Sequence, residues 1–468
     1  MNKRKLLLKF VFACSLLCTW GVQACGKNVV AYVSSSVGSD DNDGTMPHPV
    51  RTIARAQQLA DTILLKSGDI FYESVVHRNG KIGKYGNGAK PMICGWKRII
   101  TPRWEQVEPD LWKIALCDDN YTGFQTKGHP ERNNVGCIRE YDKNLIHGRR
   151  VQYYKELKED WDMWQTPHHS RKDVTEHDFD TLYIKYSGNP NNLKIEFSVG
   201  TNGMVIGQCI LEDVRIEGFG QCGIGVETQT TIRRCELDAI GGMTQMNDNA
   251  FTSLGNGVEV WIGKDVEDCL IENCVVSRCY DCGMSLQGDW QRNGHARNIV
   301  FQKNVIIECC QGWEDFLNSQ EQDEFHDCYF RNNIVINSGK TSGFNYPAGR
   351  RKYCHVLSGN SKVNRHMRIY GNYFFGGNYY CALACQGEYK ANLWKDNTCV
   401  IRRGDLIMSN YDGSKDVLMI PLDKKQSVEE MIAQYRQLTG DTTTKFIIKS
   451  DRKINREIKR FKRKYSNL

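Results

Sequence analysis

Two glutamates that could act together lie in short segments that begin with a glycine and recur in the middle of the chain. Glu259 belongs to Gly257-Val-Glu-Val-Trp261, and Glu314 belongs to Gly312-Trp-Glu-Asp-Phe316. A third segment, Gly283-Met-Ser-Leu-Gln287, stands between them. Side chains alternate along a strand, so the residue two positions after each glycine points outward. If the three strands stack at about 4.8 Å, the two carboxylates lie roughly 9–10 Å apart.

That spacing suits acid–base cleavage of a glycosidic bond, because inverting glycosidases hold their acid and base about 6.5–9.5 Å apart. Glu227 is a third carboxylate, one strand below Glu259 and roughly 7–8 Å away on the diagonal. Asp281 precedes the middle segment. Carboxylates clustered in a groove raise one another's pKa, as a general acid requires. The candidate catalytic residues are therefore Glu259, Glu314, Asp281 and Glu227.

Aromatic and polar residues beside these carboxylates are the candidate substrate contacts. They are Trp261, Gln287, Trp290, Arg292, His295 and Asp315. Trp261 and Gln287 belong to the next outward row, and residues 288–297 form a loop that would overhang the site. The tryptophans could stack on sugar rings, while Arg292 and His295 could meet an acidic group on the substrate. Asp315 departs from the pattern, because strand alternation would turn it inward.

Two other interpretations remain open. Elimination from a uronic-acid polymer needs a base, for which Arg278, Arg292, His295 and Arg297 are candidates, and Ca²⁺ could neutralise the substrate acid at Asp248 and Asp289. The dense acidic cluster that Ca²⁺ prefers is not evident, so we rank elimination second and expect no cofactor for hydrolysis. The third interpretation is a solenoid that binds glycans or builds a surface without catalysis.

A six-residue phrase recurs along the same part of the chain and predicts the strands that would position the glycine-led segments. The phrase reads apolar, two variable residues, Asn or Cys, one variable residue, apolar. It starts at Leu211, Ile232, Ile271, Phe301, Phe330, Ile369 and Trp394. Short β-branched or aromatic segments that return every 20–40 residues, followed by turn residues, indicate stacked strands rather than helices. The pattern predicts an all-β fold, a right-handed single-stranded parallel β-helix, in which the recurring Asn and Cys side chains stack from coil to coil.

Five regions follow from this pattern. We expect a signal peptide at 1–25, an N-terminal cap and first coils at 26–99 with a short helix near 51–59, and an inserted β-rich lobe at 100–200. The β-helix core occupies 201–420, and its outward row runs Gly225, Glu259, Ser285, Glu314 and Asn345. A basic tail occupies 421–468 and contains helices. The simplest interpretation of this tail is a solvated helix; the other is contact with an anionic polymer or lipid head groups.

The ends of the chain and its overall charge bear on location and partners. A basic start, an apolar stretch and small residues before Cys25 predict export, either with cleavage or with lipidation of Cys25 as the only membrane attachment. The net charge of +7 comes from the tail, where 13 basic residues face 6 acidic ones after residue 420. We therefore expect an exported, periplasmic, outer-membrane or secreted monomer that binds a polysaccharide or oligosaccharide and no nucleic acid. The 20 cysteines fall mostly in apolar strands and indicate packing rather than disulfides.

With these repeats, the chain resembles the right-handed parallel β-helix superfamily, which includes pectate lyases, chondroitinase-like lyases and several glycoside hydrolases. The resemblance covers residues 30–75 and about 205–400. Segments at 257–261, 281–287 and 312–314 resemble motifs of exported glycan-acting members. The resemblance implies the fold and a carbohydrate ligand, but it does not decide between hydrolysis, elimination and binding.

Overall fold

The computed structural model describes most of the chain. The described residues are 29–99, 103–116, 134–151, 153–165, 180–247, 250–263, 265–288, 294–317, 325–339, 354–359, 367–377, 379–384, 392–402, 405–410, 420–421 and 427–465. The expectations for the signal peptide, Cys25, Asp248, Asp289, Trp290, Arg292 and Asn345 lie outside them. Within these residues, no helix combines the length and the apolar character needed to span a membrane.

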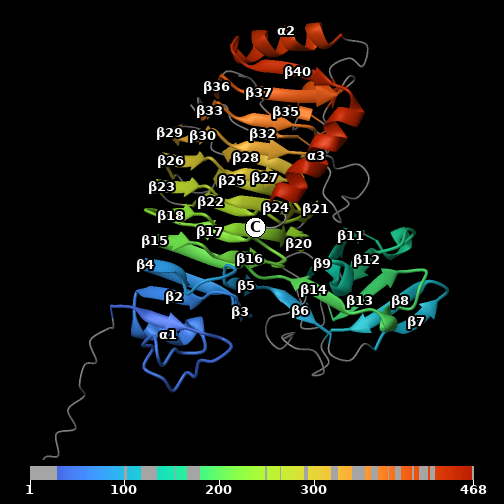
Figure 1. The fold of residues 1–468 in the computed structure, drawn as a ribbon. Coiled ribbons are helices and arrows are strands. Elements are labelled where there is room, and N and C mark those ends of the chain that lie inside the picture. Colours follow the sequence, from blue (N-terminus) through green and yellow to red (C-terminus); the bar gives the residue numbers. More distant parts are fainter. Residues whose placement is uncertain are drawn as a thin grey trace, which may run out of the picture.

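Parallel strands stacked in three rows build the main body, which Figure 1 shows as a column. Row I consists of the first half of β15 (Met204–Glu212), β17 (Ile224–Val226), β22 (Val258–Ile262), β25 (Cys282–Gly288), β28 (Gln311–Leu317), β32 (Val356–Gly359), β35 (Tyr379–Ala384) and β38 (Leu406–Asn410). Row II consists of β1 (Ala31–Val33), β2 (Thr62–Lys66), β4 (Val75–Tyr85), the second half of β15, β18 (Thr231–Arg233), β23 (Val266–Glu272), β26 (Ala296–Gln302), β29 (Phe325–His326), β30 (Tyr329–Arg331), β33 (Arg368–Tyr370) and β36 (Leu393–Lys395). The first half of β4 also extends row I, beside β15.

Row III is the separate ten-stranded sheet. It consists of β3 (Ile70–Phe71), β5 (Met92–Cys94), β16 (Arg215–Glu217), β19 (Glu236–Ile240), β24 (Val275–Cys279), β27 (Val305–Ile307), β31 (Ile334–Ile336), β34 (Tyr373–Phe375), β37 (Thr398–Arg402) and β40 (Lys445–Lys449). From β17 to β37 the chain visits rows I, II and III in turn, and each strand pairs in parallel with the strand one coil later. The expected parallel β-helix is confirmed.

The asparagine ladder forms at the bend between rows II and III. Asn304 donates from its backbone and side-chain nitrogens to Oδ1 of Asn333, at 3.0 and 3.1 Å. Asn333 makes the same pair of bonds to Asn372, which makes them to Asn397. Each amide also donates to a backbone carbonyl of the row II strand one coil earlier, as Asn333 does to Phe301. The ladder therefore satisfies polar groups that would otherwise be buried without partners.

A substitution within the ladder tests this role. We expect Asn333→Leu to lower the free energy of unfolding by at least about 3 kcal/mol, because it leaves several buried donors and acceptors unsatisfied. Asn333→Cys should cost less, since the chain itself places Cys235 and Cys274 at this bend, where both are buried. The midpoints of chemical unfolding, followed by circular dichroism, measure both effects. Equal midpoints for the two variants would contradict the ladder's role.

Side chains inside the coils are apolar, and many are cysteines. Ile224, Val258, Met284 and Trp313 from row I are all fully buried, as strand alternation predicts. All 15 cysteines among the described residues are free and buried, which supports packing as their role. Both ends of the column are covered by helices. α1 (Ile53–Leu59) lies at the first coil, and α2 (Val428–Thr439) lies across the last.

A lobe of two mainly antiparallel sheets projects from the side of the column (Figure 1). One sheet has the order β10 (Leu145–His147), β9 (Val135–Glu140), β14 (Ile195–Val199) and β6 (Trp96–Arg98). The other has the order β11 (Arg149–Arg150), β12 (Asp162–Gln165), β13 (Thr181–Lys185), β8 (Leu111–Ala115) and β7 (Glu105–Glu108). A hairpin of β20 (Thr244–Asn247) and β21 (Ala250–Ser253) follows row III. The last helix, α3 (Asp451–Tyr465), lies against row III.

Candidate active site on row I

The two glutamates occupy one outward row, two coils apart. Glu259 on β22 pairs with Ser285 on β25, and Ser285 pairs with Glu314 on β28. Gly225 on β17 pairs with Glu259, which completes four of the five positions expected from the sequence. With neighbouring strands about 4.8 Å apart, the backbones at Glu259 and Glu314 are separated by roughly 9–10 Å.

The fifth position of the row differs from the expectation. The strand that pairs with β28 is β32, and its Leu357 stands beside Glu314. The sequence pattern instead placed residues 343–347 there, with Asn345 on the row. The glycine-led segments do not predict the length of the loop between two coils, and β32 begins later in the chain than the segment expected at this place. An apolar leucine therefore borders the carboxylates on this side.

Glu259 is held in a setting that favours its protonated form. Burial raises the pKa of Glu259, and the negative charge of Asp281 acts in the same direction. Hydrogen bonds from Asn256 and the thiol of Cys222 oppose these effects without cancelling them, and the Asn256 amide lies 2.8 Å from Oε1. A carboxyl group with a raised pKa can donate a proton near neutral pH.

Glu314 is also enclosed on the row. It is 7% exposed and accepts a hydrogen bond of 3.1 Å from the side-chain amide of Gln287. Each glutamate thus accepts a hydrogen bond from one side-chain amide, and the charge of Asp281 acts in addition on Glu259.

Two buried polar atoms near the glutamates have no hydrogen-bond partner among the described residues. The hydroxyl of Ser285, which stands between Glu259 and Glu314 on the row, is fully buried and unpaired. The Oε1 atom of Gln311 is also unpaired, while its amide nitrogen lies 3.4 Å from Asp281. Buried polar groups are nearly always satisfied, so unpaired ones beside a carboxylate cluster indicate a place where water or substrate binds.

The other expected site residues divide into two groups. Asp281 lies in the turn before β25, close enough to influence the charge of Glu259. Trp261 is 46% exposed and stands beside Gln287 on the next outward row. These residues adjoin the glutamates as the sequence suggested. His295 is exposed and lies before β26 in row II, where its backbone N–H donates to Asp265.

Three expectations require correction or restriction. Asp315 cannot contact substrate, because it is fully buried inside the coil and accepts hydrogen bonds from Trp313, Ser358 and Asn392. Its inward direction follows from strand alternation. Glu227 is held by Arg78 in a bidentate ion pair at 2.6 Å, which leaves it neutralised. Arg278, a candidate base for elimination, lies in row III rather than row I.

The lobe reaches the turns that lead into row I, a relationship that the sequence did not reveal. Gly136 on β9 packs closely on Gly241. A Cβ atom added to Gly136 would lie 2.3 Å from the carbonyl oxygen of Gly241. Tyr280, which directly precedes Asp281, is buried in a cluster with Trp96 and Cys137. The lobe therefore contacts the turns at the Asp281 side of the row.

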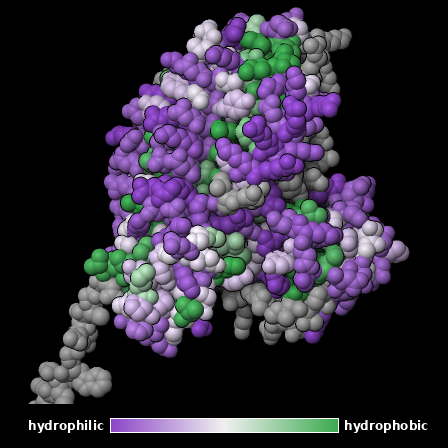
Figure 2. Space-filling view, in the orientation of Figure 1, coloured by the Kyte–Doolittle hydropathy of each residue, from purple (hydrophilic) through white to green (hydrophobic). Residues whose placement is uncertain are grey.

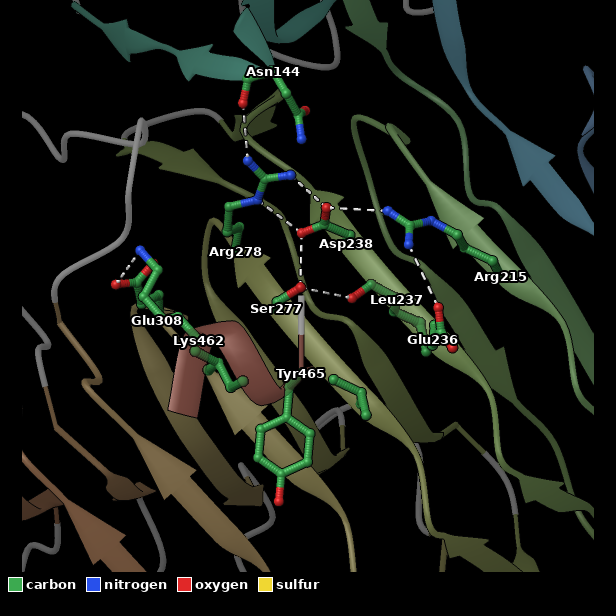
Figure 3. A pocket seen from close by; sticks show the side chains of 12 residues that line it. Asn144, Arg215, Glu236, Leu237, Asp238, Ser277, Arg278, Glu308, Lys462 and Tyr465 are labelled. Carbon is green, nitrogen blue, oxygen red and sulfur yellow. Dashed lines mark hydrogen bonds and ion pairs between the residues drawn. The ribbon is translucent and has the colours of Figure 1, made fainter. Parts of the chain in front are cut away.

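A cavity of about 220 Å³ lies on another face, between row III, the lobe and α3 (Figure 3). Asp238 stands at its centre and pairs with Arg278 and Arg215, while Ser277 donates to it at 2.7 Å. Lys462 of α3 pairs with Glu308 at 2.8 Å across the cavity. These charges neutralise one another. The ion pairs around the cavity therefore hold row III, the lobe and α3 together, and they do not indicate a second reactive site.

No three His, Cys, Asp or Glu side chains converge as metal ligands anywhere in the part of the chain that the structure describes.

The sequence matches no family description and no curated protein. Solved structures with similar folds include "The complex structure of XylC with xylose", with 13% identity, 81% of this chain and 69% of that one covered, and a TM-score of 0.46. Another is titled "Glycoside hydrolase", with 10% identity, 82% and 95% covered, and a TM-score of 0.44. A third is the GH136 lacto-N-biosidase from Eubacterium ramulus, with 10% identity, 90% and 68% covered, and a TM-score of 0.36.

Proposed function

We propose that the chain is a carbohydrate-active enzyme that hydrolyses a polysaccharide or oligosaccharide with inversion at the anomeric carbon. The observation that carries the proposal is the pair Glu259 and Glu314, two coils apart on one outward row. Glu259, whose pKa is raised, protonates the leaving oxygen as the general acid. Glu314, held by the Gln287 amide, removes a proton from the attacking water as the general base.

The spacing supports inversion rather than retention. Retaining glycosidases hold their two carboxyl groups about 5–5.5 Å apart, because one of them attacks the sugar directly. A separation of about two strand spacings leaves room for a water molecule between the sugar and the base. The unpaired hydroxyl of Ser285 lies between the two glutamates, and we propose that it helps to orient this water.

Substrate binding follows from the neighbours of the pair. The exposed ring of Trp261 offers an apolar face on which a sugar ring can stack. Gln287 stands between this ring and Glu314, so it can hold a sugar hydroxyl as well as the base. These residues support a sugar as the ligand of the site and leave the kind of sugar open.

A glycan panel tests the proposal. Plant, host and microbial polysaccharides are incubated with the protein, and both new reducing ends and absorbance in the ultraviolet are measured. We expect saturated products from at least one glycan, with the inverted anomer formed first when the reaction is followed by proton NMR. Unsaturated products would instead establish elimination, and retention of configuration would remove Glu314 as the base. Binding without any product would leave only the glycan-binding interpretation.

A further inference from the structure

The last helix, α3, carries eight basic and two acidic residues. Its inner side is apolar: Ile454 and Ile458 are buried, and Phe461 and Tyr465 are partly buried, against the outer surface of row III. Its two acidic residues already have partners, since Asp451 lies 3.5 Å from Arg402 and Glu457 lies 3.0 Å from Lys449. Of its eight basic residues, Lys462 is the one paired with a carboxylate within the described residues.

Seven exposed basic side chains therefore lack an acidic partner within the described part of the chain. They are Arg452, Lys453, Arg456, Lys459, Arg460, Arg463 and Lys464. Four of these, Arg452, Arg456, Arg460 and Lys464, follow one another at every fourth residue and form a single line along the helix, which we call the cationic stripe. Figure 2 shows a continuous hydrophilic surface over this helix.

The cationic stripe opposes the stability of its own helix. Like charges four residues apart on a helix repel each other and destabilise it. The apolar contacts with row III hold the helix in place despite this repulsion. An anionic ligand that neutralised the stripe would remove the repulsion and release bound counterions, and both effects favour binding.

A hollow of about 750 Å³ adjoins the stripe. It is lined by Arg456, Glu457, Arg460, Phe461 and Lys464. The stripe repeats its charges about every 6 Å along the helix axis, which suits an extended chain with regularly spaced anions. Phe461 packs against row III, and the part of its ring that stays uncovered lines the hollow and offers a small apolar surface to a sugar ring.

The packing of α3 argues against a lipid bilayer as the ligand. An amphipathic helix binds a membrane by inserting its apolar face among the lipids. Here that face is occupied by Val305, Ile307 and Phe375 of row III. The exposed side of α3 offers positive charge, which suits a soluble polyanion rather than the interior of a bilayer.

We propose that α3 is a second glycan-binding surface, in which the cationic stripe and Phe461 hold a carboxylated or sulfated polysaccharide. The surface lies on row III, whereas Glu259 and Glu314 lie on row I. It can therefore retain an anionic polymer whether or not the row I site cleaves it, and this proposal does not depend on hydrolysis.

Binding measurements on the full chain test the proposal. Polygalacturonate, heparin and neutral dextran are compared by isothermal titration calorimetry at low and at moderate salt. We expect binding to one or both polyanions, none to dextran, and an affinity that falls as salt rises. Polygalacturonate and heparin distinguish carboxylate from sulfate as the recognised group. An absence of binding to both polyanions would overturn the proposal.

Charge variants locate the binding surface. Arg456→Gln/Arg460→Gln should weaken polyanion binding at least tenfold and lower the steepness of its salt dependence. Lys303→Gln/Lys395→Gln removes the same charge from exposed positions beside row II and should change the affinity less than twofold. Arg456→Lys/Arg460→Lys keeps the charge and should bind nearly as the parent, which controls for folding. Equal losses of affinity in both Gln variants would show that net charge alone causes the effect. Tighter binding to DNA or to anionic vesicles than to either polysaccharide would assign the stripe to another partner. Either result overturns the proposal.

Discussion

Glu259→Gln is expected to reduce hydrolysis of the glycan identified by the panel by about 10²–10⁴-fold, the usual contribution of a general acid. Glutamine keeps the size of the side chain and its contact with Asn256, but it cannot transfer a proton to the leaving oxygen. Glu314→Gln should cause a loss of similar size, because the attacking water then lacks its base. Initial rates of reducing-end release at saturating and at low substrate measure kcat and kcat/KM for both variants.

The role of Glu259 as the general acid also predicts how the rate of hydrolysis changes with pH. Burial and the charge of Asp281 raise the pKa of Glu259, and the reaction needs Glu259 protonated. The wild-type rate should therefore fall as the pH rises through this elevated pKa. Asp281→Asn removes the negative charge that raises it, so this fall should move to lower pH. A profile that Asp281→Asn leaves unchanged would contradict the proposed role of Glu259.

A matched control separates catalysis from surface charge. Glu267 is an exposed glutamate on β23 in row II, away from the row I carboxylates. Glu267→Gln should leave kcat and kcat/KM within about twofold of wild type, as is usual for surface changes away from special features. Near-normal activity in both Glu259→Gln and Glu314→Gln would end the two-carboxylate mechanism.

Asp238→Asn is expected to lower the free energy of unfolding by about 3–5 kcal/mol, the usual cost of removing one partner from a buried ion pair. Asp238 is 8% exposed and accepts from both Arg278 and Ser277, with Arg215 at 3.6 Å (Figure 3). The asparagine would leave two largely buried guanidinium groups without their shared carboxylate. Chemical unfolding, followed by circular dichroism and tryptophan fluorescence, measures the change.

Asp213→Asn is the matched control, because Asp213 pairs with Arg234 at the surface. Exposed ion pairs contribute about 0–1 kcal/mol, so this variant should unfold close to wild type.

The pH dependence of unfolding gives a further test of the ion pairs of Asp238. Burial raises the pKa of Asp238, but the charges of Arg278 and Arg215 and the hydrogen bonds from Arg278 and Ser277 together bring it below the usual 3.8. The stabilisation is complete above pH 3.8 and is lost as the pH falls through the lower folded value, so wild type and Asp238→Asn should converge in strong acid.

The repeating elements were predictable because the signal repeats within the sequence. Each six-residue phrase gives a strand, a bend and a second strand, as Ile271–Val276 does across β23 and β24. The glycine-led segments supplied the register that places Glu259 and Glu314 on one row. In a stack of coils, each residue contacts its equivalent one coil away, so a periodic sequence determines both the strands and which residues are neighbours.

The sequence alone determined the solenoid, the asparagine ladder and the shared row of the two glutamates, since all three follow from periodicity. Only the tertiary structure decided which carboxylates remain available for chemistry. Glu227 is neutralised by Arg78, 149 residues earlier in the chain, and Asp315 is turned into the core toward Asn392. The protonation of Glu259 likewise depends on burial and on Asp281 in the next coil. Burial and ion pairing arise between segments that are far apart in the sequence, and no local pattern records them.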